Sequence, residues 1–148
     1  MAPEPIRIRR FRPADLDAVV AVERRSFRRD AYPPSLFLDY YRQGALFLVA
    51  PAAGEVTAYV LVWISRTGAE LVSIAVDPAA RRAGLAKALL MSVLRRLRRA
   101  GVTRLSLMVR TRNRAALRFY EGFGFRRIRL VRGYYERGGD GVLMSRQV

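Results

Sequence analysis

Runs of apolar residues along the chain predict the strands of a sheet. The strongest run is 71–76, Leu-Val-Ser-Ile-Ala-Val, which is nearly continuous and β-branched, as is typical of a strand covered on both faces. Asp77-Pro78 should end this strand, because proline supplies no N–H to the ladder and restricts the residue before it. Shorter apolar or alternating runs predict further strands at residues 6–11, 45–50, 56–64, 105–109, 127–131 and 141–144.

Helical spacing of apolar residues predicts four helices between these strands. The first begins at Pro13, the second covers residues 35–41, and the third begins after Gly84. Asn113 can cap a fourth helix, in which Tyr120 lies on the apolar face and should point inward. We therefore expect an α/β fold in a single domain over residues 1–148, with a mixed, mostly antiparallel sheet of six to seven strands and about four helices on both faces.

The first predicted helix carries an acid on its apolar face. Glu23 falls at the (i, i+3/i+4) spacing from Val19 and Val20, where an apolar side chain is usual. Two interpretations stay open. Glu23 either pairs with one of the nearby arginines or faces a substrate cleft.

Composition removes several kinds of chemistry. The chain has no cysteine and no histidine, which excludes a thiol nucleophile, a disulfide framework, a Ser-His triad and the usual zinc ligands. We expect no metal, and any proton transfer must use a carboxylate, a tyrosine, a terminus or water. The N-terminus lacks a signal-peptide core and no apolar run reaches about 20 residues, so we expect a cytoplasmic monomer without membrane contact.

The net charge of +16 favours anionic partners. Lys87 is the only lysine among 28 basic residues, so nearly all of the positive charge is arginine. CoA phosphates, acidic peptides and ribosomal RNA would all suit such a surface, and weak ribosome or RNA association is one expectation. A solvated basic surface without a dedicated partner is the equal alternative.

The segment between the strongest strand and the third helix has the features of a phosphate site. Residues 81–86, Arg-Arg-Ala-Gly-Leu-Ala, place a glycine and small side chains at a helix start. Unpaired N–H groups and the positive end of the helix dipole favour an anion there, and Gly84 allows close approach to the backbone. The alternative is that Gly84 only makes a turn.

Two motifs resemble those of the GNAT superfamily of N-acetyltransferases. Residues 76–86, VDPAARRAGLA, resemble its acetyl-CoA signature, usually Gln/Arg-x-x-Gly-x-Gly/Ala. Residues 113–125, NRAALRFYEGFGF, resemble its later motif, Asn-x-x-Ala followed by Tyr and Gly-Phe. The resemblance implies that acetyl-CoA is the co-substrate, that backbone N–H groups hold its pyrophosphate, and that Tyr120 protonates the departing thiolate. The implied cofactor-binding residues are Ile74, Ala75, Val76, Arg81, Arg82, Ala83, Gly84, Leu85, Ala86, Lys87, Asn113 and Tyr120.

A narrower resemblance is to the protein N-terminal acetyltransferases, which include bacterial ribosomal-protein alanine acetyltransferases and archaeal relatives. Residues 133–144, GYYERGGDGVLM, carry its more discriminating part. In that group, tyrosines like Tyr32, Tyr134 and Tyr135 line a tunnel for a peptide N-terminus. The resemblance therefore implies acetyl transfer to the α-amino group of a protein or peptide.

One position departs from this subgroup. Five residues before its asparagine the subgroup usually has glutamate or histidine, whereas this chain has Met108, which cannot accept a proton. An α-amino group, with a pKa of about 7.7–8.0, is roughly a tenth neutral at pH 7, so a missing base argues for an N-terminal acceptor over lysine. Glu23 or Glu70, acting through water, could still serve as the base.

Two other functions remain open beside N-terminal acetylation. One is a GNAT enzyme acting on a small amine, although the positive charge would repel cationic substrates. The other is a basic RNA- or ribosome-binding module with a degenerate acetyltransferase fold, motivated by the arginines and by Met108.

Overall fold

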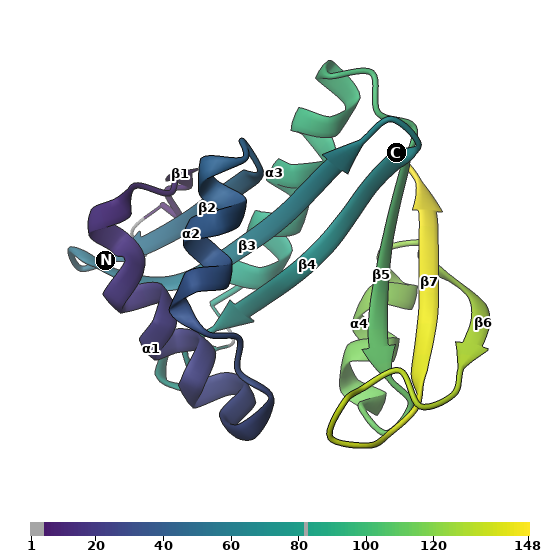
Figure 1. The fold of residues 1–148 in the computed structure, drawn as a ribbon. Helices are drawn as coiled ribbons and strands as arrows, with labels where there is room; N and C mark the ends of the chain where they lie inside the picture. The colour runs from purple at the N-terminus through teal and green to yellow at the C-terminus, as the bar shows by residue number, and fades with distance from the viewer. Residues whose placement is uncertain (1–4, 82) are drawn as a thin grey trace.

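The chain folds around one mixed sheet with helices on both faces (Figure 1). A computed structural model describes residues 5–81 and 83–148, and all statements on structure refer to these. The sheet has seven strands in the order β1-β2-β3-β4-β5-β7-β6. The strands are β1 (Arg9–Arg10), β2 (Leu46–Ala52), β3 (Glu55–Ser65), β4 (Gly68–Val76), β5 (Arg104–Arg110), β6 (Arg126–Val131) and β7 (Gly141–Gln147).

Four α-helices and three short 3-10 segments connect the strands. The helices are α1 (Leu16–Phe27), α2 (Pro34–Arg42), α3 (Leu85–Arg99) and α4 (Arg114–Gly122). The 3-10 segments are η1 (Pro13–Asp15), η2 (Arg28–Asp30) and η3 (Pro78–Ala80). The predicted fold class, with six to seven strands and about four helices, is confirmed.

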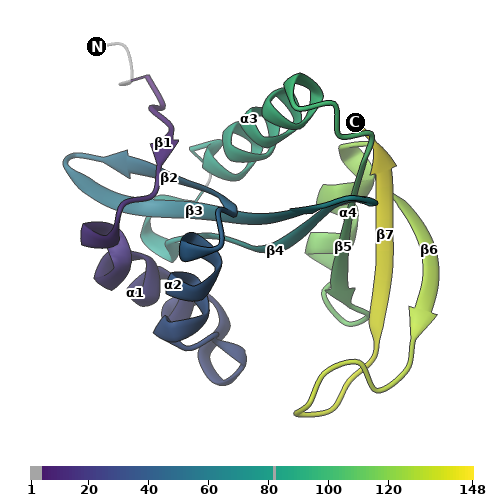
Figure 2. The ribbon, with the colours of Figure 1, turned by 45° about the horizontal axis from the view of Figure 1, so that its top comes forward.

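Two hydrophobic cores lie on opposite faces of the sheet. One packs α3 and α4 against the sheet, with Leu89, Leu117 and Leu107 among its buried members. The other packs α1 and α2 against the first half of the sheet, around Phe37 and Tyr59. On the face of the sheet that α1 and α2 cover, no described helix packs against β5, β7 and β6, as Figure 2 shows.

Strands β4 and β5 separate along their length. Their parallel pairing is restricted to two registers, Ala69 with Leu105 and Glu70 with Ser106. Beyond these pairs the strands diverge, and Figure 1 shows the sheet open between the ends of β4 and β5. Beyond these two pairs, the edge of β4 that faces β5 is therefore unpaired.

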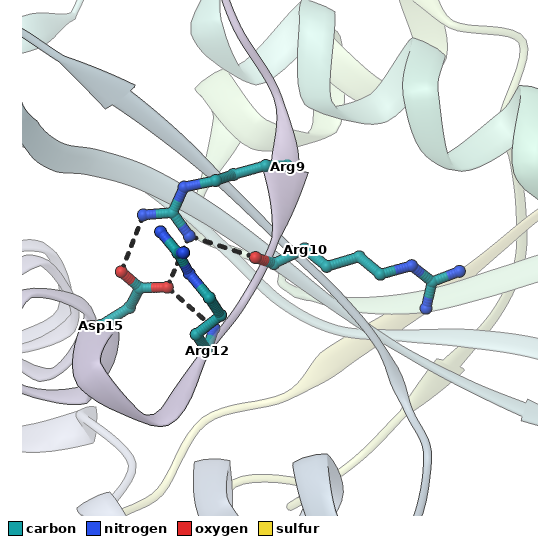
Figure 3. Close-up of polar contacts among 4 residues, drawn as sticks. All are labelled: Arg9, Arg10, Arg12 and Asp15. Carbon is teal, nitrogen blue, oxygen red and sulfur yellow. Dashed lines mark hydrogen bonds and ion pairs between the residues drawn. The ribbon is translucent and has the colours of Figure 1, made fainter.

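The first strand is much shorter than predicted. We expected strand structure over residues 6–11, but β1 contains only Arg9 and Arg10, paired with Val49 and Leu48 of β2. The chain then turns into η1 through a charged contact, in which the Arg9 guanidinium donates to both oxygens of Asp15 at 2.8 and 2.9 Å (Figure 3). An arginine–carboxylate contact thus holds the edge strand to the start of the first helix.

Candidate active site

The free edge of β4 supplies backbone groups toward the opening. The N–H of Asp77 donates to the carbonyl of Thr57 on β3. In an antiparallel pair of strands, every second residue directs its N–H and C=O groups toward the partner strand, here β3. The backbone N–H and C=O groups of Ala75 therefore face β3. Those of Ile74 and Val76 face the opposite side, where β5 has diverged from β4. Arg81 Nε occupies part of this edge, because it donates to the Val76 carbonyl at 3.3 Å.

The start of α3 lies at the end of the same strand and has the geometry of an anion site. Gly84 is its N-cap, with φ 78° and ψ 17°, a left-handed conformation that favours glycine. No side chain caps the helix, so the first N–H groups of α3, from Leu85 onward, are open to a ligand. A Cβ built at Gly84 would meet nothing within 4 Å, so the requirement for glycine here is conformational. Arg82 lies outside the described residues.

The α4 helix faces the opening from the other strand. Asn113 is its N-cap and accepts the Ala116 N–H at 3.1 Å, which confirms the predicted cap. Tyr120 points inward, as predicted, and packs against Phe119 and Phe125 with ring centroids 5.2 and 5.5 Å away. Burial raises the pKa of Tyr120, so the phenol stays protonated at neutral pH. Among the described residues its hydroxyl makes no hydrogen bond, and burial is the one cause of the raised pKa.

A pocket of about 370 Å³ lies on the sheet face that no described helix covers. Trp63, Glu70 and Met108 line it from β3, β4 and β5, and Tyr134 lines it from the loop before β7. These residues are up to 71 positions apart in the sequence, 134 minus 63, and only the fold brings them together. The pocket lies where β4 and β5 are still paired, next to their divergence.

Three predicted acceptor tyrosines lie close together. Tyr134 and Tyr135 pack edge to face with ring centroids 4.9 Å apart. Burial, and after it the nearby Tyr134, Glu23, Tyr135 and Tyr40, raise the pKa of Tyr32 to about 12. The hydroxyl of Tyr32 is therefore neutral at any working pH, and it can donate or accept a hydrogen bond.

Glu23 is buried and fully engaged, with an exposed fraction of 1%. Its carboxyl accepts the Tyr32 N–H at 2.8 Å, the Ser73 hydroxyl at 3.2 Å and the Tyr59 hydroxyl. Burial raises its pKa, against the opposing effect of these hydrogen bonds. Of the two interpretations of Glu23, pairing with an arginine is wrong, because α1 turns this acid into the core toward hydroxyl groups of β3 and β4. The carboxyl instead links the Tyr32 loop to the central strands.

Glu70 lies in the open pocket, in contrast to Glu23. It is exposed and is paired in register with Ser106, two residues before Met108. Its negative charge adds to the effect of burial in raising the pKa of Tyr134 and of Tyr40, which places it near both phenols. Within the described residues it has no hydrogen-bond or ion-pair partner, so the carboxylate is free to bind a cationic or proton-donating ligand.

Met108 packs tightly in the same pocket. A Cβ built at Gly141 would lie 2.6 Å from Met108 Cε and 3.4 Å from Tyr134 Cβ. Gly141 therefore leaves the space in which the methionine and the tyrosine approach each other. This part of the pocket is therefore filled by an apolar side chain that cannot accept a proton.

Sequence reasoning missed three residues of this region. Tyr40 lies on α2 and Trp63 on β3, and their rings pack edge to face at 5.8 Å beside the pocket. Arg110 follows Met108 on β5 and contacts both loops that carry the tyrosines. Nothing in the sequence marked these three residues as part of a site, since aromatic residues are common in cores and arginine is abundant in this chain.

Comparison with known proteins identifies the family. The model of the "Acetyltransferase (GNAT) family" matches residues 16–125. The chain belongs to this family and is an acetyl-CoA-dependent N-acetyltransferase. Among the described residues, no group of three or more acidic side chains could hold a metal ion, and none of the described helices is long and apolar enough to cross a membrane.

Three relatives cover nearly the whole chain. An uncharacterised N-acetyltransferase of Methanocaldococcus jannaschii is 35% identical over 95% of this chain and 90% of its own. The [ribosomal protein bS18]-alanine N-acetyltransferase of Escherichia coli is 34% identical over 88% of this chain and 90% of its own. The crystal structure of Ard1 from Thermoplasma volcanium superposes with a TM-score of 0.92 at 32% identity, covering 97% of both chains.

Proposed function

We propose that the protein transfers the acetyl group of acetyl-CoA to the α-amino group of a protein or peptide. The observation that carries this proposal is the pocket lined by Glu70 and Tyr134 beside the opening between β4 and β5. Relatives described as an N-alpha-acetyltransferase and as a ribosomal-protein alanine N-acetyltransferase support the same acceptor class. Tyr32, Tyr134 and Tyr135 are the proposed walls for the acceptor chain.

The proposed donor site uses the backbone. The pyrophosphate binds at the start of α3, where Ala83–Lys87 contribute N–H groups and the helix dipole favours an anion. The amide groups of pantetheine pair with the free edge at Ile74 and Val76, and a neighbouring N–H polarises the acetyl carbonyl. Asn113 can contact the pantetheine arm through its amide N–H₂, because its carbonyl oxygen caps α4.

The proposed reaction is direct attack. The neutral amine nitrogen forms a bond to the thioester carbon, the C–S bond breaks, and the thiolate leaves. Tyr120, kept protonated by burial, donates its proton to the sulfur. The amine nitrogen loses a proton at the same stage, so a base has to accept it.

We assign that base to Glu70, acting through water, and a positioning role to Glu23. Glu70 lies in the acceptor pocket without a partner among the described residues, and its negative charge also attracts an α-ammonium group. Glu23 is buried, and its oxygens already accept three hydrogen bonds. Its carboxyl fixes the loop of Tyr32 and has no access to substrate.

The test measures CoA release with acetyl-CoA and two matched peptides. One peptide has a free N-terminus and no lysine, and the other has a blocked N-terminus and one internal lysine. We expect turnover with the free N-terminus alone. Turnover with the lysine peptide alone would overturn the acceptor assignment, and turnover with polyamines alone would establish the small-amine alternative.

Binding of an RNA backbone is a second candidate, supported by the distribution of charge. Between Asp77 and Glu121 the chain has no acidic residue but contains eleven arginines and one lysine. Burial lowers the pKa of Arg96 on α3, and the adjacent cations Arg10, Arg99 and Arg95 lower it further. Figure 3 shows Arg10 directed away from Asp15, which Arg9 contacts.

This candidate has its own test. A fluorescent single-stranded RNA should bind with an affinity that falls steeply as salt increases, and Arg95→Gln with Arg99→Gln should reduce that slope. Binding that the double variant leaves unchanged would remove the α3 surface as the site. Acetyl transfer by the same variant serves as the control for the enzyme.

A further inference from the structure

Arg110 connects three groups that come from distant parts of the chain. Its Nη2 lies 3.0 Å from the Asp30 carboxylate in η2, and its Nη1 donates to the Gly138 carbonyl at 2.8 Å. Its guanidinium carbon lies 3.9 Å from the centre of the Tyr135 ring. One side chain at the end of β5 thus contacts the loop after α1 and the loop before β7.

We propose that Arg110 is a positioning residue that holds the two walls of the acceptor site at a fixed separation. The inference rests on the proposed function, because the walls are the loop that carries Tyr32 and the loop that carries Tyr134 and Tyr135. Asp30 lies two residues before Tyr32, and Gly138 lies three residues after Tyr135. A contact that fixes Asp30 and Gly138 therefore fixes the spacing of the tyrosines.

The geometry requires arginine. The planar guanidinium directs separate N–H groups to Asp30 and Gly138 while its face covers the Tyr135 ring. Lysine has a single compact ammonium group and cannot make the three contacts together. A Cβ built at Gly139 would lie 2.5 Å from Nη1 of Arg110, so this glycine, with φ 108°, leaves the space that the guanidinium occupies.

Each wall is also held from its own side, which makes Arg110 the link between them. In the loop before β7, the Thr111 N–H donates to the Asp140 carbonyl at 3.1 Å, and the Gly133 N–H donates to Asp140 Oδ1 at 2.9 Å. On the opposite wall, the Glu23 carboxyl holds the Tyr32 N–H. Neither set of bonds crosses from one wall to the other, whereas Arg110 contacts Asp30 beside one wall and Gly138 in the other.

The link is partly exposed, which sets the size of the expected effect. The side chains of Arg110 and Asp30 are 30% and 43% exposed. An ion pair of this kind is worth about 1.5- to 5-fold in an equilibrium constant, and salt weakens it. Loss of the arginine removes three contacts and should have the larger effect.

The first experiment measures steady-state kinetics of Asp30→Asn and Arg110→Gln with a free-N-terminus peptide. We expect the peptide KM to rise about threefold in Asp30→Asn and about tenfold in Arg110→Gln, while the KM for acetyl-CoA changes less than twofold. Raising the ionic strength should increase the peptide KM more in the wild type than in Asp30→Asn, which has already lost the Asp30–Arg110 ion pair. Arg112→Gln is the matched control, since Arg112 is exposed two residues further along and has no role in either wall.

Equal effects on both KM values, or no effect in both variants, would overturn the proposal. The second experiment is amide hydrogen exchange without substrate, and it remains decisive if the wild type acetylates no peptide. Exchange in both loops, residues 28–32 and 133–139, should accelerate in Asp30→Asn and in Arg110→Gln but not in Arg112→Gln. Acceleration confined to the loop before β7 would show that Arg110 orders one wall only, and the link would be refuted.

Discussion

The two halves of the proposed active site are built from different chemical groups. The donor half consists mainly of backbone, namely the free edge at Ile74 and Val76 and the first turn of α3 behind Gly84. The acceptor half consists of side chains. Among them, Glu70 precedes the donor segment in the sequence and Tyr134 follows it. Backbone groups are the same in every protein, so the donor half depends on local conformation. The acceptor half depends on which side chains the fold brings together.

The same contrast separates the two acids near the acceptor. Glu23 is buried among hydroxyl groups and a backbone N–H, whereas Glu70 lies in an open pocket. The proposed roles follow this difference in burial, with a positioning role for Glu23 and proton transfer for Glu70. Four variants test the contrast between the donor and acceptor halves and between the two acids. They are given from the largest expected effect to the smallest.

Tyr120→Phe should give the largest loss. Removal of the proton donor should lower kcat by roughly 100- to 1,000-fold, because general acid catalysis contributes that much. Acetyl-CoA affinity, measured by calorimetry, should stay within twofold. The fold should also be preserved, since the Tyr120 hydroxyl makes no hydrogen bond among the described residues. A kcat near the wild-type value would remove Tyr120 from the proton path.

Glu70→Gln should lower kcat/KM for a free-N-terminus peptide by about 30-fold at pH 7. This is less than the usual general-base effect, because about a tenth of α-amino groups is already neutral at that pH. The defect should shrink, without vanishing, as the pH rises through the α-amino pKa of about 7.7–8.0, since the peptide then no longer has an ammonium proton to lose before attack. Glu55→Gln, at the far hairpin of β3, is the control. A defect confined to the peptide KM, with kcat unchanged, would assign Glu70 to binding alone.

Gly84→Ala should raise the KM for acetyl-CoA by about tenfold, because a side chain is strained at φ 78° and the start of α3 would shift. Gly101→Ala is a close match, with φ 76°, no neighbour within 4 Å of the added Cβ, and a place at the other end of α3. Both variants should lose about 1 kcal/mol of stability in urea unfolding. Equal acetyl-CoA affinity of the two variants would show that Gly84 does not contribute to the donor site.

Glu23→Gln should change the pH dependence of stability more than the rate. Burial raises the pKa of Glu23 above the value of 4.5 that it has when exposed, so the folded state favours the protonated acid. This stabilising effect is complete below about pH 4.5 and is lost as the pH rises through the folded-state pKa. The wild type should therefore lose stability relative to Glu23→Gln between those two values. Urea unfolding of both proteins at several pH values measures the difference, and parallel curves would contradict it.

The donor half was predictable because its determinants are contiguous. Residues 76–86 contain the strand end, the glycine turn and the helix start, and local conformation alone follows from them. Asn113 and Tyr120 likewise belong to one helix, and the cap and the inward direction are confirmed. The roles of these residues in binding and proton transfer remain predictions.

The acceptor half was less predictable because its contacts are distant in sequence. The arginine partner expected for Glu23 was wrong, since Tyr59 and Ser73 lie 36 and 50 positions away. Trp63 and Tyr40 meet across two elements, and neither has a local pattern that marks a site. Arg110 is one arginine among 27, and only its position between two loops distinguishes it.

The separation of β4 from β5 has a consequence for the protein without its donor. An unpaired edge in the middle of a sheet can add any extended chain, including one from another molecule, and this invites aggregation. On the proposed binding mode, the pantetheine arm acts as a substitute strand that closes the sheet. The donor would then serve as a structural part as well as a reactant, and cellular acetyl-CoA would protect the enzyme from self-association. Light scattering of the free and donor-saturated protein during storage would show this directly.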